Sequence, residues 1–192
     1  MNLHLIVFIF AITFGVSTLV EASSVPEDFT PEGLYSHFMK ELNSAQNTED
    51  RFYALTNVAL PSYEFGKTED AMKYANELLK LADSFQSNWN YGNAIHKGNI
   101  ALGRIALTSN KVELAKEYLY KAGNTPGSPQ LNSFGPNMTL AKELLERAEK
   151  DAVKKYLIQC GKFWKNDNDK LEFWSFQIDK GRVPRFGTTL LY

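Results

Sequence analysis

The chain has 192 residues, with 21 Lys and Arg against 22 Asp and Glu, and a single cysteine. This near balance of charge excludes nucleic-acid binding driven by bulk positive charge. One thiol excludes an intramolecular disulfide and a cysteine-based zinc site, so a chain of this length must rely on its hydrophobic core.

Residues 1–22 have the pattern of an export signal. Residues 3–20 are almost continuously apolar and lead into Val20-Glu21-Ala22, which has compact residues at the positions that signal peptidase reads. We expect cleavage after Ala22, which leaves residues 23–192 as one exported domain, periplasmic or secreted. An uncleaved membrane anchor is the alternative, because about 18 apolar residues can just span a bilayer.

Helical spacing dominates the rest of the chain. Thr30-Pro31 starts a first helix as N-cap and first helical residue, with one apolar face formed by Leu34, Phe38 and Leu42. Thr48 and Thr68, each followed by Glu-Asp, start two further helices. Asn110, with Glu113 three residues later, predicts a capping box at the start of a further helix. Pro61 interrupts its helix, where we expect a kink.

Three windows share one spacing, in which small or apolar residues follow a turn residue in successive steps of five, four and three positions. The positions are 66-71-75-78, 110-115-119-122 and 148-153-157-160. This spacing resembles the tetratricopeptide repeat, in which small residues let two antiparallel helices cross closely and a positive-φ residue separates them. The resemblance implies an all-α solenoid of about three helix pairs, with repeats at about 51–84, 95–128 and 134–165. The segments "FGPNMTLAKELLE", "FWK" and "GRVPRFG" also resemble small bacterial tetratricopeptide-like proteins, a likeness that implies no particular activity.

The C-terminal region, residues 167–192, is expected to cap the solenoid. Leu171, Trp174 and Ile178 have helical spacing, and Gly181 ends that helix. We expect an aromatic core in the cap, made of Phe163, Trp164, Phe173, Trp174 and Phe176. The tail from residue 182 onward contains Pro and Gly and is expected to pack as an extended strip.

Residues 123–136 are rich in Pro and Gly and are expected to form a long loop between the second and third repeats. Leu131 and Phe134 are too apolar for a free linker, so we expect them to plug the seam between these repeats. A loop that lines a binding surface is the alternative.

The resemblance also implies a concave face, lined by the first helix of each repeat, that holds a protein or peptide partner. The corresponding positions are Tyr53, Asn57, Tyr63, Lys97, Arg104 and Lys142. A cationic patch that can hold a carboxylate is expected from four of them, Asn57, Lys97, Arg104 and Lys142. The alternative is a set of ordinary solvated charges.

A second candidate site for a sugar or peptide lies near the start of the predicted first helix of the middle repeat. It consists of Trp89, Tyr91, Asn93 and His96. The alternative role of Trp89 is to cap a repeat junction. The sequence contains no recognisable nucleophile motif, phosphate loop or metal-ligand spacing, so we expect no cofactor and no catalysis. A carbohydrate-binding protein or an enzyme with an unrecognised site is the competing hypothesis.

Overall fold

The computed structural model describes residues 30–191, so the predicted export signal lies outside the described part. Within that part all regular secondary structure is helical and there is no strand, which confirms the predicted all-α class. The α-helices are α1 (Pro31–Ser44), α2 (Thr48–Glu64), α3 (Thr68–Ala82), α4 (Tyr91–Thr108), α5 (Val112–Gly123), α6 (Pro129–Phe134), α7 (Thr139–Glu146), α8 (Lys150–Cys160) and α9 (Lys170–Asp179). Two short 3-10 helices are η2 (Asp83–Phe85) and η3 (Gly187–Leu190). None of the helices described here is long and apolar enough to cross a membrane.

Three helix–turn–helix pairs, α2/α3, α4/α5 and α7/α8, carry the shared spacing. Their turn residues Gly66, Asn110 and Ala148 all have positive φ, at 83°, 58° and 65°. The positions at the shared offsets are all buried: Ala71, Ala75, Leu78, Ala115, Leu119, Ala122, Val153, Leu157 and Cys160. Asn110 was therefore placed correctly as a turn residue, but the predicted capping box is wrong, because Lys111 precedes α5 without a side-chain cap.

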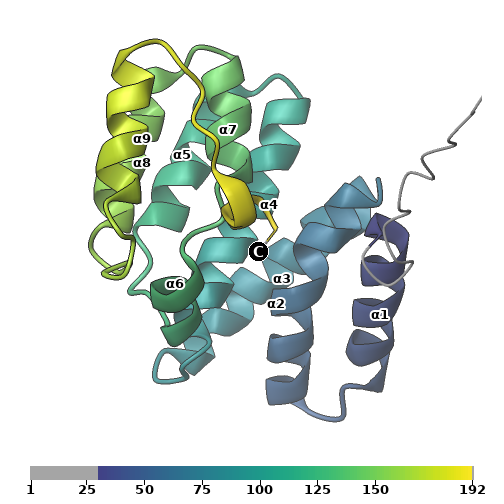
Figure 1. Cartoon of the computed structure of the whole chain (residues 1–192). Coiled ribbons are helices and arrows are strands. Elements are labelled where there is room, and N and C mark those ends of the chain that lie inside the picture. The colour runs from purple at the N-terminus through teal and green to yellow at the C-terminus, as the bar shows by residue number, and fades with distance from the viewer. Residues whose placement is uncertain (1–29, 192) are drawn as a thin grey trace, which may run out of the picture.

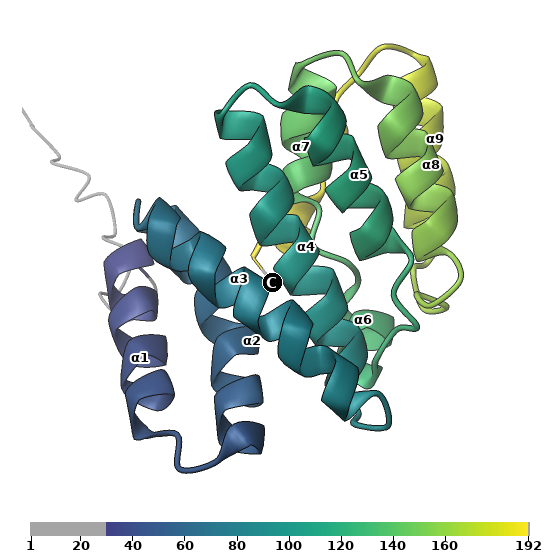
Figure 2. The ribbon, with the colours of Figure 1, turned by 180° about the vertical axis from the view of Figure 1, so that it is seen from behind.

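The first helices of successive pairs lie next to one another. Helix α2 contacts α4, and α4 contacts α7, while α3 packs on α4 and α5 packs on both α7 and α8. The helices thus follow one another from α1 at one end to α9 at the other (Figures 1 and 2). This order places α4 at the centre of the molecule, between two helix pairs.

Glycines in α4 allow its close approach to three neighbouring helices. A Cβ built on Gly98 would lie 2.9 Å from Leu79 Cγ of α3. One built on Gly103 would lie 2.3 Å from Leu140 Cδ2 of α7 and 3.5 Å from the Ala115 carbonyl oxygen of α5. A larger residue at either position would force the facing leucine side chain to move, so both glycines favour this close packing of α4.

The C-terminal cap is only partly as predicted. Trp174 and Ile178 of α9 are buried, together with Phe163 and Trp164. Phe173 and Phe176 were expected in the same core, but each is 57% exposed. They lie one residue before and two residues after Trp174, which turns them away from the face that it shares with Ile178.

The tail folds back across the helices as the yellow segment of Figure 1. Phe186 packs edge-on against Trp174, with 4.9 Å between ring centroids. The Met138 N–H donates a 2.9 Å hydrogen bond to the Thr189 carbonyl oxygen. The predicted extended strip is therefore replaced at its end by η3, and the tail is fixed to the start of α7.

Candidate functional site

The loop between α5 and α7 contains the short helix α6, and only one of its two predicted anchors is buried. Ser128 caps α6 by accepting the Leu131 N–H through its hydroxyl, at 3.0 Å. Leu131 is 6% exposed, but Phe134 is 54% exposed. A six-residue helix has one short buried side, which Leu131 occupies, and Phe134 lies at the rim of a cavity.

Asn93 fastens this loop to α4. Its Nδ2 donates to Asn90 Oδ1 at 2.9 Å and to Gln130 Oε1 at 3.2 Å. The Ser128 hydroxyl donates to Asn93 Oδ1. Asn93 was a candidate ligand contact, but both ends of its carboxamide are used to join α4 to α6.

His96 plays a similar part and is 1% exposed. The Asn137 N–H donates to His96 Nε2 at 2.9 Å, so the ring proton is on Nδ1, which donates to the Ala122 carbonyl oxygen at 3.1 Å. Burial lowers the pKa of His96 to about 4, outweighing the hydrogen bond to Ala122, while the charge of Lys97 also lowers it. His96 is thus a neutral side chain that joins two backbone segments.

Two adjoining cavities form a groove between α1, α2, α4, α6 and the tail, which we call the central groove. The first cavity, of about 240 Å³, has walls that include Trp89, Gln130 and Phe134. The second, of about 230 Å³, has an apolar half made of Leu34, Phe38, Leu60, Pro61 and Leu191. Both cavities share Asn57, Lys97 and Asn137. These three residues therefore mark the middle of the groove.

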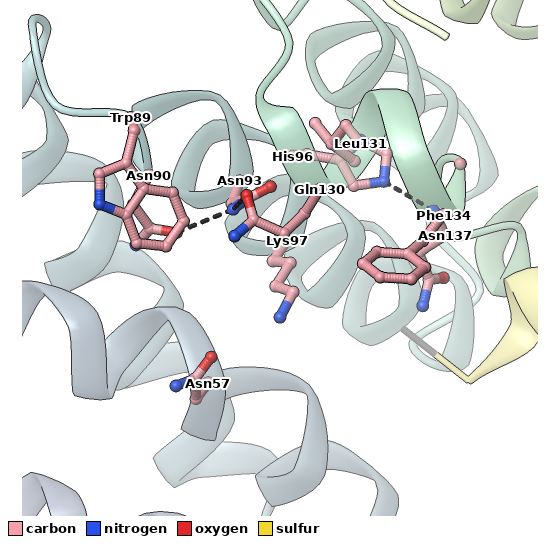
Figure 3. Close-up of a pocket in the computed structure, with 11 residues that line it drawn as sticks. Asn57, Trp89, Asn90, Asn93, His96, Lys97, Gln130, Leu131, Phe134 and Asn137 are labelled. Carbon is pink, nitrogen blue, oxygen red and sulfur yellow. Dashed lines mark hydrogen bonds between the residues drawn. The ribbon is translucent and has the colours of Figure 1, made fainter. Parts of the chain in front are cut away.

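Lys97 and Asn57 face each other across the middle of the central groove (Figure 3). Lys97 is half-buried, and burial lowers the pKa of its ammonium group. Within residues 30–191 it makes no ion pair and no hydrogen bond, and the Asn57 side chain in that range has no hydrogen bond either. The groove thus presents two polar side chains whose hydrogen-bonding capacity is unused.

Arg104 was predicted to help hold a partner's carboxylate, but its guanidinium is already paired within the chain. It forms ion pairs with Glu64 at 3.0 Å and with Glu143 at 2.8 Å, and its side chain is only 13% exposed. Its guanidinium also lies 4.6 Å from the centroid of the Tyr63 ring. Helical spacing placed Arg104 on the expected face, but it gave no sign that carboxylates from α2 and α7 converge there.

Lys142 and the aromatic candidates have other local partners. Lys142 pairs with Glu146 at 3.0 Å along α7, so it is also a compensated charge. Trp89 is 50% exposed and stacks on Tyr53, with 5.6 Å between ring centroids. Tyr91 is partly buried against the core. Of the predicted residues, Asn57, Trp89, Asn93, His96 and Lys97 line the first cavity together.

Sequence reasoning did not identify Asn90, Gln130 and Asn137 as cavity residues. The signal available was the abundance of carboxamides in residues 86–93 and 130–137, two segments that the fold brings together. In the described range no three His, Cys, Asp or Glu side chains converge in a way that can hold a metal ion. No family model, curated protein or solved structure matches this chain.

The two loop anchors are expected to differ in their effects on stability. Leu131→Ala should lower the free energy of unfolding by about 2–4 kcal/mol, because it removes a buried side chain. Phe134→Ala should change it by less than about 0.5 kcal/mol, because that ring is half in solvent. Urea melts of both variants test this difference, and equal losses would contradict the assigned burial.

Proposed function

We propose that this chain is an exported, non-catalytic scaffold of tetratricopeptide-like type that binds a peptide segment of a partner protein in the central groove. The repeated spacing of the three helix pairs and the contacts between their first helices support the solenoid. The apolar segment before Ala22 supports export. The observation that carries the binding function is the groove itself, in which Asn57 and Lys97 have no hydrogen-bond or ion-pair partner among residues 30–191 and lie between aromatic and aliphatic side chains.

The dimensions of the groove favour an extended chain over one compact ligand. Each cavity is smaller than the roughly 300–1,000 Å³ of typical small-molecule pockets, but the two are joined. Carboxamide side chains can both donate to and accept from the peptide main chain. Pro61 has no N–H, so the Asn57 carbonyl oxygen lacks its usual helical donor at this face. A bound main chain can supply one.

Selection from a random nonapeptide display library against the purified protein tests the proposal. We expect enriched peptides whose affinity falls at least about fivefold in Asn57→Ala, which is about 1 kcal/mol of binding free energy. Glu117→Ala, at an exposed position of α5, is the matched control and should bind like the parent. Both variants should melt like the parent. Failure to enrich any peptide, or equal binding by Asn57→Ala, would count against the central groove.

A carbohydrate-binding function is the second candidate, and the half-exposed rings of Trp89 and Phe134 favour it. They flank a cavity lined by carboxamides, and flat aromatic faces with amide donors suit a sugar ring. Titration with a panel of monosaccharides, followed by tryptophan fluorescence and compared in Trp89→Phe, separates this candidate from the first. Saturable binding of a sugar without any peptide binding would replace the peptide proposal.

A further inference from the structure

Within the part of the chain that the structure describes, the central groove contains one charge without an ion-pair partner. The first cavity has no Asp or Glu in its lining, and Lys97 is its only charged residue. The second cavity contains one carboxylate, Glu64, which is held by Arg104 at 3.0 Å. Among the described residues the groove is therefore cationic at its middle, with no carboxylate positioned to neutralise Lys97.

A carboxylate is the ligand group that best satisfies such a lysine. A half-buried ammonium group has lost part of its hydration without gaining a partner, which disfavours its charged form. A carboxylate placed beside it would form a charge-assisted hydrogen bond and restore that form. The second oxygen of the carboxylate can accept from the Asn57 carboxamide, which faces Lys97 across the groove.

Apolar side chains lie on either side of Lys97 and Asn57, beside the carboxamides of the first cavity. Trp89 and Phe134 flank the first cavity, and Leu34, Phe38 and Leu60 line the second. An extended chain alternates the direction of its side chains at about 3.3 Å per residue, so every second side chain points the same way. A segment passing through the groove can therefore direct every second side chain into it, with an apolar one in each cavity and a polar one between them.

We propose that the central groove selects an extended peptide in which an acidic side chain lies between two apolar side chains. Its carboxylate binds Lys97 and Asn57, and the apolar side chains enter the two cavities. This inference rests on the proposed peptide-binding function and adds the chemistry of the recognised segment. It makes Lys97 the residue that determines specificity and Trp89, Phe134 and Leu60 the residues that accommodate the flanks.

Synthetic nonapeptide libraries with a fixed central residue test the charge requirement. All peptides are acetylated and amidated, and their central residue is either Glu or Gln between apolar flanks. The central side chain of the Glu peptides is therefore the only carboxylate. We expect Glu peptides to bind with dissociation constants about tenfold lower than their Gln counterparts, the usual worth of a charged hydrogen bond. Raising the salt concentration should reduce this preference.

Substitutions of Lys97 assign the preference to one residue. Lys97→Met keeps the length of the side chain without its charge and should bind Glu and Gln peptides equally. Lys97→Arg should keep the preference. Lys142→Met, which removes a lysine already paired with Glu146, is the matched control and should behave like the parent. Melting curves of all three variants show that the fold is intact.

Each outcome decides between the inference and the function on which it rests. Equal binding of Glu and Gln peptides by the parent protein would overturn the acidic specificity and leave peptide binding intact. Preference for Glu that survives in Lys97→Met would also overturn it. Absence of binding by every library would overturn the proposed function itself.

Discussion

Acidification from about pH 7 to about pH 5 is expected to lower the free energy of unfolding by about 2 kcal/mol through His96 alone. Burial lowers the pKa of His96 to about 4 in the folded protein, whereas an unfolded histidine has a pKa near 6.5. Between these values the unfolded chain binds the proton more strongly. Stability is therefore fully present above the unfolded pKa and is lost as the pH falls toward 4.

Urea melts at several pH values, made on the parent and two variants, measure this effect. His96→Gln keeps a donor and an acceptor but does not titrate, so its stability should vary much less over this range. His37→Gln makes the same substitution at an exposed position of α1 and is the matched control. Parent-like pH dependence in His96→Gln would show that the buried imidazole is not the cause.

Gly92→Ala is expected to lower the free energy of unfolding by about 3 kcal/mol. A Cβ on Gly92 would lie 1.8 Å from the carbonyl oxygen of Gly127, so backbone must move to admit it. Gly127 has φ of 87°, and a Cβ there would approach Phe163 to 2.6 Å, which limits how the loop can yield. The gain of about 1 kcal/mol in helix propensity does not offset this clash.

Gly161→Ala is the matched control, because the same methyl group is added in open surroundings. The nearest atom to its Cβ would be the Ile158 carbonyl oxygen at 3.5 Å, and its φ of −62° suits any residue. We expect a change within about 1 kcal/mol, in the stabilising direction. Comparable losses for Gly92→Ala and Gly161→Ala in denaturant melts would rule out the close approach of α4 and the loop.

The helical spacing predicted the parts of the fold that depend on local periodicity. Positions 71, 115 and 153 lie at the same offset from their turn residues, and all are buried. Ala148 has positive φ although alanine rarely adopts it, and only the repeated spacing indicated a turn there. The exposure of Phe173 could not be predicted in this way, because an aromatic residue alone does not reveal which side of a cap helix is covered.

The candidate site was harder to predict because it depends on contacts between distant segments. The predicted binding residues lie on α2, α4 and α7, the first helix of each pair, but the ion pairs of Arg104 and Lys142 were not predicted. Arg104 is neutralised by Glu64 and Glu143, which are 40 and 39 residues away in sequence. Lys97 keeps its charge uncompensated because no carboxylate of the described chain reaches it. The spacing of residues along one helix does not reveal which carboxylates of other helices pair with Arg104 or that none within residues 30–191 reaches Lys97.

The hydrogen bond from the Met138 N–H to the Thr189 carbonyl has a consequence for folding during synthesis. Residues 138 and 189 are far apart in sequence, so this contact cannot form until residue 189 has left the ribosome. Helices α1 to α5 contact one another through nearby sequence and can assemble earlier. The start of α7, and with it the Asn137 wall of the central groove, is therefore fixed later than α1 to α5, and the nascent chain lacks a finished groove until residue 189 has emerged.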